Sequence, residues 1–476
     1  MPALLQTVFR KITPVVEDRS PDTEGPGQLA RTMGVFQLSM LGIGATVGTG
    51  IFIILSEAVP VAGPAVIWSF VIAAVVAGLT ALCYAEMASV MPASGSSYSY
   101  AYATLGELPA IGVGACLLLE YGVSAAAVSV GWSEYLNQAL DNLLGIRIPE
   151  ALSSAPEAGG IVNLPAIILV ALCTLLLIRG VGESAKVNAA MVMIKIAVLV
   201  MFIIIGLTGW NENNLADFAP MGMAGITGAA GIIFFSYIGL DAVSTAGSEA
   251  KNPGRTLPIA ILITLGVVTL LYVGVALVAV GAQGMSEFEG QEAGLAAILQ
   301  AVTGSTWPGT VLAIAAVFSI FSVTLVVLYG QTRIFYAMSC DGLIPSVFGK
   351  VHPKTKTPVA GTLLTGSAVA VLAGLLPINF LAEMTSIGTL VAFLIVAIAV
   401  IVRRRKNLGG SAPFRVPLYP LTPILAIAGC LWIIKDLRPH TLIAFGAWST
   451  FALIFYFAYS IKNSHLNKSK ELAAVN

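Results

Sequence analysis

The first residues able to do chemistry lie in a glycine-rich stretch, 41–52 (LGIGATVGTGIF), in the middle of the chain's first long apolar segment. Glycine costs about 1 kcal/mol relative to alanine inside a helix, so Gly48 and Gly50 together predict an unwound turn. At membrane depth, the backbone groups freed by such a turn are tolerated only beside protein or a water-filled cavity. A second break is predicted at residues 234–241 (FFSYIGLD), again inside an apolar segment.

Two facing breaks can bind a zwitterion. Amides at the start of a half-helix suit a carboxylate, and unpaired carbonyls at the end of the preceding half-helix suit an ammonium group. Paired interrupted helices in the two halves of a chain are therefore typical of a secondary transporter's binding site, with an amino acid as the natural ligand. The alternative is that the glycines only permit close helix packing, since Gly44 and Gly48 form a small-xxx-small pattern.

Few charged residues lie inside apolar segments, and each is a site candidate. Lys195 lies about 12 Å from the nearer helix end at 1.5 Å per residue, so we favour a functional role over a side chain that reaches the interface. Glu120 is a candidate partner for a cationic side chain or, through water, for the substrate ammonium. Asp241 either lines the pocket or caps the half-helix after the second break. A histidine relay is not expected, because all the histidines lie in predicted loops: His352, His440 and His465.

The composition predicts an integral membrane protein. Of 476 residues, 57% are hydrophobic and 10% are charged, against about 25% charged in a soluble domain. The five cysteines lack metal-ligand spacing and are interpreted as packing residues. We expect no metal, no cofactor and no nucleic-acid partner.

Apolar runs predict an all-α architecture of twelve transmembrane helices. Their expected limits are 33–58, 64–90, 108–137, 161–179, 187–209, 225–247, 256–282, 307–338, 357–377, 381–402, 417–435 and 440–461. A short outer helix is predicted at 293–303. The tail 1–32 is polar and carries no secretory signal; its residues 3–13 form either a short surface helix or a frayed tail.

The positive charges orient these spans. If the amino terminus is cytosolic, 20 of the 24 Lys and Arg residues fall in cytosolic segments. The predicted outer loops hold only Arg147, Lys435 and Arg438. The positive-inside rule therefore places both tails, 1–32 and 462–476, in the cytosol, and we expect a plasma-membrane protein in contact with lipids.

Several motifs together carry a family resemblance: GIGATVGTGIF (42–52), FFSYIGLD (234–241), EAKNPGRTLP (249–258), QTRIFYAMSCDGLIP (331–345) and PFRVPLYP (413–420). They resemble the amino acid–polyamine–organocation superfamily, and within it the cationic amino acid transporter branch. Twelve spans, fewer than mammalian members usually have, resemble a bacterial homologue. The resemblance implies a LeuT-like fold of two inverted five-helix repeats, 33–209 and 225–402, with helices 1 and 6 broken and two further helices at 417–461.

The resemblance also implies roles for residues at the two breaks. The amides of Thr49 and Gly50 would hold the substrate carboxylate, and the Phe235 ring would act as a gate. The α-ammonium would be held by four carbonyls: Thr46, Phe235, Ser236 and Ile238.

Lys195 resembles the fifth-helix lysine that replaces a sodium ion in proton-coupled members of the superfamily. It would contact first-helix carbonyls near Gly44 and Val47 and a hydroxyl of the eighth helix. Ser319 and Ser322 are the candidates for that hydroxyl, and Ser322 is alternatively directed at the substrate side chain. Proton release from Lys195 would then loosen the first helix.

The expected function is secondary active transport of L-amino acids, small neutral or cationic, by proton-coupled symport and alternating access. An amino acid exchanger and a non-transporting membrane sensor are the alternatives. No Ser–His or paired-Asp arrangement at membrane depth supports an enzyme.

Overall fold

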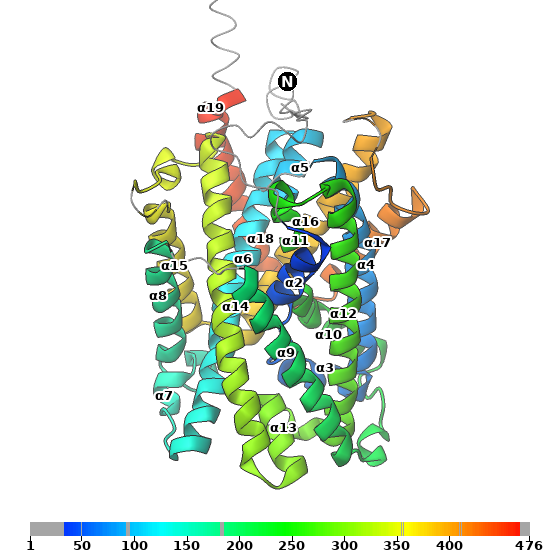
Figure 1. Cartoon of the computed structure of the whole chain (residues 1–476), viewed down its shortest axis with the longest axis vertical. Helices are drawn as coiled ribbons and strands as arrows, with labels where there is room; N and C mark the ends of the chain where they lie inside the picture. Colours follow the sequence, from blue (N-terminus) through cyan, green and yellow to red (C-terminus); the bar gives the residue numbers. More distant parts are fainter. Residues whose placement is uncertain are drawn as a thin grey trace, which may run out of the picture.

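The computed structural model describes residues 33–48, 50–91, 96–180, 185–353, 355, 357–408, 410 and 412–466 (Figure 1). Within these residues the chain is helical, and the only β-type pairing is an isolated bridge between Met33 and Ala250. The predicted all-α class is therefore confirmed.

Within the part of the chain that the structure describes, eight segments are long and apolar enough to cross a membrane. One combines α3 (Leu55–Ala62) with α4 (Val66–Val90), and another combines α10 (Gly222–Ile233) with α11 (Ala242–Thr245). The others are built on α6 (Glu107–Leu144), α9 (Ala185–Gly206), α12 (Pro253–Ala282), α14 (Thr306–Cys340), α16 (Ile378–Arg405) and α18–α19 (Pro439–Phe455 and Ile461–Asn463).

Shorter apolar helices occupy much of the remaining predicted membrane sequence. They are α2 (Val35–Thr46), α8 (Leu164–Ile178), α13 (Gly294–Thr303), α15 (Val359–Leu375) and α17 (Leu421–Lys435). α13 coincides with the short outer helix predicted at 293–303. The other four fall inside predicted spans, although each is shorter than a full crossing usually requires.

Two features differ from the sequence prediction. The connection predicted after residue 90 contains a helix, α5 (Ser96–Thr104), whose tyrosine- and serine-rich sequence has no apolar run to reveal it. α6 continues to Leu144 instead of ending near 137, because its polar last turns still form helix. It ends where Gly145 adopts a left-handed conformation and donates its N–H to the Asp141 carbonyl.

The two interrupted segments lie in the middle of the bundle and run in opposite directions. In Figure 1 the chain descends through α2 and then α3, whereas it ascends through α10 and then α11. α2 packs on α9 and α12, while α6 packs on α14 and α16. We call the end of the molecule where α2 begins the α2 end, and the opposite end the α13 end.

Candidate functional site

The first predicted break is confirmed. α2 ends at Thr46, Val47 is extended, and Gly48 has a φ of +119° before α3 begins at Leu55. Glycine tolerates this backbone conformation, which other residues rarely adopt. Gly50 is buried. Thr49, predicted to present an amide to the substrate, lies outside the described residues.

The second predicted break is also confirmed. α10 ends at Ile233, and a tight turn, η5 (Phe234–Tyr237), follows. Ile238 is extended and Gly239 has a φ of +95°, so the chain leaves the helical path before α11. α2 and α10 each contain 12 residues, so the two breaks follow half-helices of equal length.

The two breaks touch at two points, and each point has a glycine on one side. A Cβ on Gly50 would lie 2.2 Å from Ser236 Oγ and 2.7 Å from Ser236 Cα. A Cβ on Gly239 would lie 2.9 Å from the Ala45 carbonyl carbon. Gly50 and Gly239 therefore allow close packing, and the segments that they bring together are the two breaks.

Three of the last four carbonyls of α2, those of Ile43, Gly44 and Thr46, accept hydrogen bonds, as buried backbone acceptors require. Two bonds are local: Thr46 Oγ1 donates to the Gly42 carbonyl over 2.8 Å, and the Val47 N–H donates to the Ile43 carbonyl over 2.7 Å. Two bonds come from other spans. Lys195 Nζ of α9 donates to the Gly44 carbonyl over 3.0 Å, and the Tyr272 hydroxyl of α12 donates to the Thr46 carbonyl over 2.8 Å.

Lys195 is buried at the first break, with 1% of its surface exposed. A Cβ on Gly48 would lie 3.7 Å from Lys195 Nζ and 3.9 Å from the Ser319 carbonyl oxygen, so α9, α14 and the break converge here. Its ammonium lies at the carboxyl end of α2, where the helix dipole favours a positive charge. The alternative of a side chain that reaches the membrane interface is therefore wrong. Ser319 and Ser322 of α14 are both buried.

Two buried carboxylates, those of Glu120 and Asp241, lie beside the second break, toward the α2 end of the molecule. Glu120 of α6 is 0% exposed, and neither of its oxygens has a hydrogen-bond partner among the described residues. Asp241 accepts from the Tyr121 hydroxyl over 3.1 Å and from Ser96 Oγ over 3.4 Å. Asp241 occupies the N-cap position of α11, as the capping interpretation expects, but its side chain makes no capping hydrogen bond there. The two carboxylates interact electrostatically across the interior.

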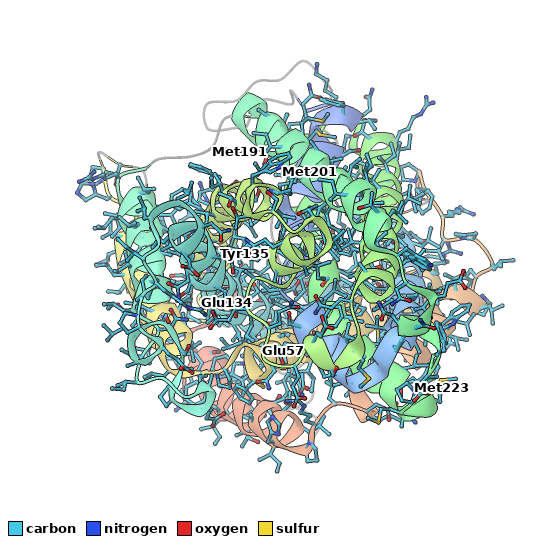
Figure 2. All side chains as sticks on the ribbon, turned by 90° about the horizontal axis from the view of Figure 1, so that it is seen from below. Glu57, Glu134, Tyr135, Met191, Met201 and Met223 are labelled. Carbon is cyan, nitrogen blue, oxygen red and sulfur yellow. The ribbon has the colours of Figure 1, made fainter. Side chains whose placement is uncertain are left out.

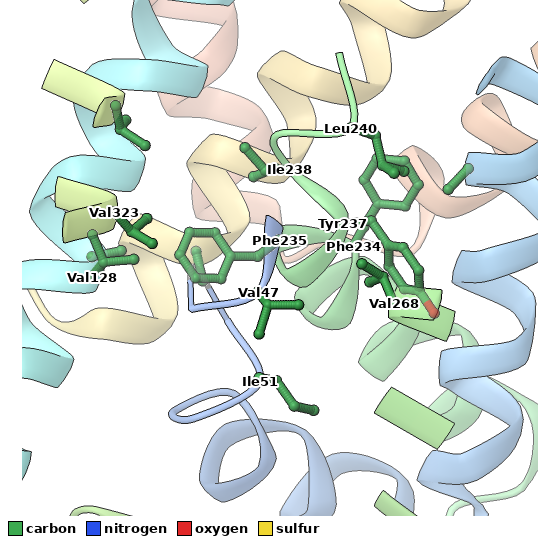
Figure 3. Packing of buried hydrophobic residues seen from close by; sticks show 14 of the residues in the cluster. Val47, Ile51, Val128, Phe234, Phe235, Tyr237, Ile238, Leu240, Val268 and Val323 are labelled. Atoms are coloured by element: carbon green, nitrogen blue, oxygen red, sulfur yellow. The ribbon is translucent and has the colours of Figure 1, made fainter. Parts of the chain in front are cut away.

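Apolar side chains form a wall beside the breaks. Figure 3 shows the Phe235 ring directed toward Val128 of α6 and Val323 of α14, with Val47 and Ile238 close by. Phe235 is completely buried and Ile238 is 3% exposed. Ser236 is also buried, and its hydroxyl has no hydrogen-bond partner within the described part of the chain. The region thus combines backbone polar groups, one free hydroxyl and an aliphatic wall.

At the α13 end, a tyrosine supports the half of the first interrupted segment that follows the break. The Tyr135 hydroxyl of α6 donates to the Phe52 carbonyl over 2.6 Å. Figure 2 shows Tyr135, Glu134 and Glu57 in the interior of the bundle at this end, whereas Met223 lies at the periphery.

Sequence reasoning missed the tyrosines that donate to backbone carbonyls and to Asp241. The available signal was a tyrosine in the middle of an apolar span, because a buried phenol usually finds a hydrogen-bond acceptor. Tyr272 and Tyr121 both fit that description, and Tyr135 lies near the end of its predicted span. Their acceptors are distant in the sequence and were not predictable from it.

Comparison with known proteins agrees with this architecture. The chain matches the amino acid permease family over residues 33–465. It belongs to that family, and it is therefore an amino acid transporter of the membrane and not an enzyme.

Among its relatives, the branched-chain amino acid permease BcaP of Bacillus subtilis is 43% identical, over 97% of this chain and 99% of the relative. The methylthioribose transporter of the same organism is also 43% identical, over 92% of this chain and 95% of the relative. The vacuolar cationic amino acid transporter 4 of Arabidopsis thaliana is 36% identical, over 80% of this chain and 64% of the relative. The predicted resemblance to the superfamily and to cationic amino acid transporters is thereby confirmed.

Proposed function

We propose that this chain carries L-amino acids across the plasma membrane together with protons, by alternating access. The observation that carries the proton coupling is the contact of Lys195 Nζ with the Gly44 carbonyl, 3.0 Å apart, at the carboxyl end of α2. A charged lysine attracts the negative end of the helix dipole, and loss of its proton removes most of that attraction. Proton release then loosens α2 from α9 and lets the first break move.

The substrate's amino acid group binds between the two breaks. Backbone amides at Thr49 and Gly50 hold its carboxylate. The carbonyls of Thr46, Phe235, Ser236 and Ile238 hold its ammonium group. In this scheme Val47 and Ser319 stand with Gly44 around the Lys195 ammonium, and Phe235 closes over the ligand.

Two observations bear on the substrate side chain. The wall of Val128, Val323 and Phe235 fits an aliphatic side chain. Glu120, buried and without a hydrogen-bond partner among the described residues, fits a cationic side chain reached directly or through water. Ser322, buried in α14, lines the same pocket in this proposal. We infer that the site accepts small neutral amino acids and, through Glu120, admits a basic one.

We further propose twelve membrane crossings with both tails, 1–32 and 462–476, in the cytosol. The eight long segments and the four shorter helices α2, α8, α15 and α17 supply them. Spans within 33–209 and 225–402 form two inverted repeats, and α17 and α18 follow at 417–461. The opposite courses of the two interrupted segments in Figure 1 support the inversion.

A second candidate substrate is a neutral thioether sugar. The observation favouring it is the relative named as a methylthioribose transporter, which is as similar to this chain as the branched-chain permease. Such a sugar has no carboxylate for the backbone amides of the breaks and no ammonium group for their carbonyls. It should therefore compete poorly with an amino acid in this chain.

The test is uptake of labelled alanine, leucine and arginine into sodium-free proteoliposomes, with and without an inward proton gradient. Accumulation driven by the gradient supports symport. Uptake only into vesicles preloaded with amino acid means exchange, and no accumulation at all means a sensor. Suppression of uptake by methylthioribose at concentrations where amino acids fail to suppress it would favour the sugar.

Lys195→Met tests the coupling residue. We expect gradient-driven accumulation to fall at least about tenfold, because the variant has no proton to release, while substrate binding measured by thermal shift remains. Lys462→Met, a change at an exposed lysine near the chain end, is the control. An unchanged dependence of uptake on pH in Lys195→Met would contradict the role.

A further inference from the structure

A groove of about 450 Å³ lies on the outside of the bundle at the start of α12, away from the breaks. Its lining includes Arg255, Pro258, Ile259 and Leu262 of α12, together with Pro413 and Phe414 from the connection between α16 and α17. Figure 1 shows this connection, in orange, at the same end of the molecule as the first turns of α12.

The floor of the groove is apolar and faces outward. Ile259 is 36% exposed and Leu262 is 39% exposed, and they are neighbours on one helix face. Pro413 closes the groove on one side, since a Cβ on Gly254 would lie 2.8 Å from its ring. α12 is long and apolar enough to span the membrane from Pro253 onward. In the crossing proposed above, its first turns would lie at the boundary between headgroups and acyl chains.

The rim of the groove is basic. Arg255 is exposed and has no ion-pair partner among the described residues, and Lys251 and Arg415 are exposed close by in the sequence. A ligand in the groove would meet the positive charge of these side chains, because backbone N–H groups at the start of α12 already have acceptors. The amides of Arg255 and Thr256 already donate to the Asn252 carbonyl over 2.9 and 3.1 Å.

Two arginines in the last turn of α16 are committed elsewhere. Arg403 and Arg404 both bind the buried Glu86 carboxylate. Arg255 lines the groove itself, and Lys251 and Arg415 add positive charge near its rim.

We propose that this groove binds one anionic phospholipid of the adjoining leaflet. The acyl chain lies over Ile259 and Leu262, and the headgroup phosphate lies beside Arg255. A free phosphate would leave the apolar floor unused, and a zwitterionic lipid would place its own cation near Arg255. A basic rim over an apolar floor at the membrane boundary matches the two chemistries of an anionic lipid.

The test is native mass spectrometry of the purified, delipidated full chain titrated with phosphatidylglycerol and, separately, phosphatidylcholine. We expect one phosphatidylglycerol to bind with preference over phosphatidylcholine. Arg255→Gln should weaken the phosphatidylglycerol site about fivefold, since one basic residue near an anionic lipid surface contributes about that factor. Leu262→Trp should block the groove and reduce lipid binding at this site by a comparable factor.

Lys462→Gln, at an exposed lysine of the same end but on α19, is the matched control and should leave binding unchanged. The proposal requires both losses: phosphatidylglycerol binding that is unchanged in Arg255→Gln or in Leu262→Trp overturns it. Equal binding of the two lipids overturns it too. Displacement by inorganic phosphate at millimolar concentration would show a simple anion site instead of a lipid site.

Discussion

Glu86 and Glu120 are both 0% exposed, yet their surroundings are opposite. Glu86, near the end of α4, accepts from Arg403 Nη2 over 2.6 Å and from Arg404 Nε over 2.9 Å. The Val416 N–H also donates to it, over 2.7 Å. Glu120, in the middle of α6, has no hydrogen-bond partner for either oxygen among the described residues.

The difference separates a carboxylate that is bonded to several elements from one whose oxygens are left without hydrogen-bond partners among the described residues. A buried polar group without a partner costs free energy, so its persistence needs an explanation such as a ligand, a proton or a water. Glu86 joins α4, α16 and the segment at Val416 through charge-assisted bonds. Glu120 has no such hydrogen-bond partner among the described residues, and the proposed function would supply one as a transported cation or a proton.

The largest expected effect comes from removing the fully paired carboxylate. Glu86→Ala leaves Arg403 and Arg404 with an uncompensated, partly buried charge, and removing one partner of a buried pair costs about 3–5 kcal/mol. The apparent melting temperature in detergent measures this, with Glu287→Ala at the α13 end as the control. A shift no larger than that of the control would contradict the structural role of Glu86.

A smaller loss of stability is expected from a substitution at the contact between the two breaks. Gly50→Ala places a methyl group against Ser236, and forcing an extra carbon into a packed interior costs about 1–3 kcal/mol. Gly112→Ala is the matched control, because nothing lies within 4 Å of a Cβ there. Equal melting temperatures for the two variants would mean that the breaks are not in contact.

The smallest effect on stability is expected at Glu120. Glu120→Gln keeps the size of a buried side chain whose oxygens have no hydrogen-bond partner among the described residues, so the change in the free energy of unfolding should stay within about 1 kcal/mol. Arginine uptake should fall at least about tenfold relative to alanine uptake, because a hydrogen bond to a charged group contributes about 1.5–3 kcal/mol. Equal weakening of alanine and arginine would argue that Glu120 is structural.

The sequence predicted the breaks because glycine clusters inside apolar runs have a local physical meaning. Gly48, Gly50 and the 234–241 stretch needed no three-dimensional information. The Lys195–Gly44 contact was expected only through the family resemblance, and the residues alone identified just a costly buried lysine. Helix α5 was missed because its sequence lacks an apolar period.

Long-range partners were beyond the sequence for a different reason. Glu86 and Arg403 are separated by 317 positions, and many basic residues near span ends were equally eligible partners. Only the packing of α16 on α4 selects among them. The same holds for Tyr272, whose acceptor Thr46 lies on another span.

The pairing of the half-helices has a mechanical consequence. α2 packs against α11 at one end of the molecule, where Met33 donates to the Glu249 carbonyl and accepts from the Lys251 N–H, while α3 packs against α10 toward the other end. Each pair contains one half of each interrupted segment. The two interrupted segments therefore cross at the glycine contact of the breaks, and this contact links the α2–α11 pair at one end to the α3–α10 pair toward the other. A displacement of either pair therefore acts on the same glycine contact, so movement at one end of the molecule is mechanically linked to movement at the other.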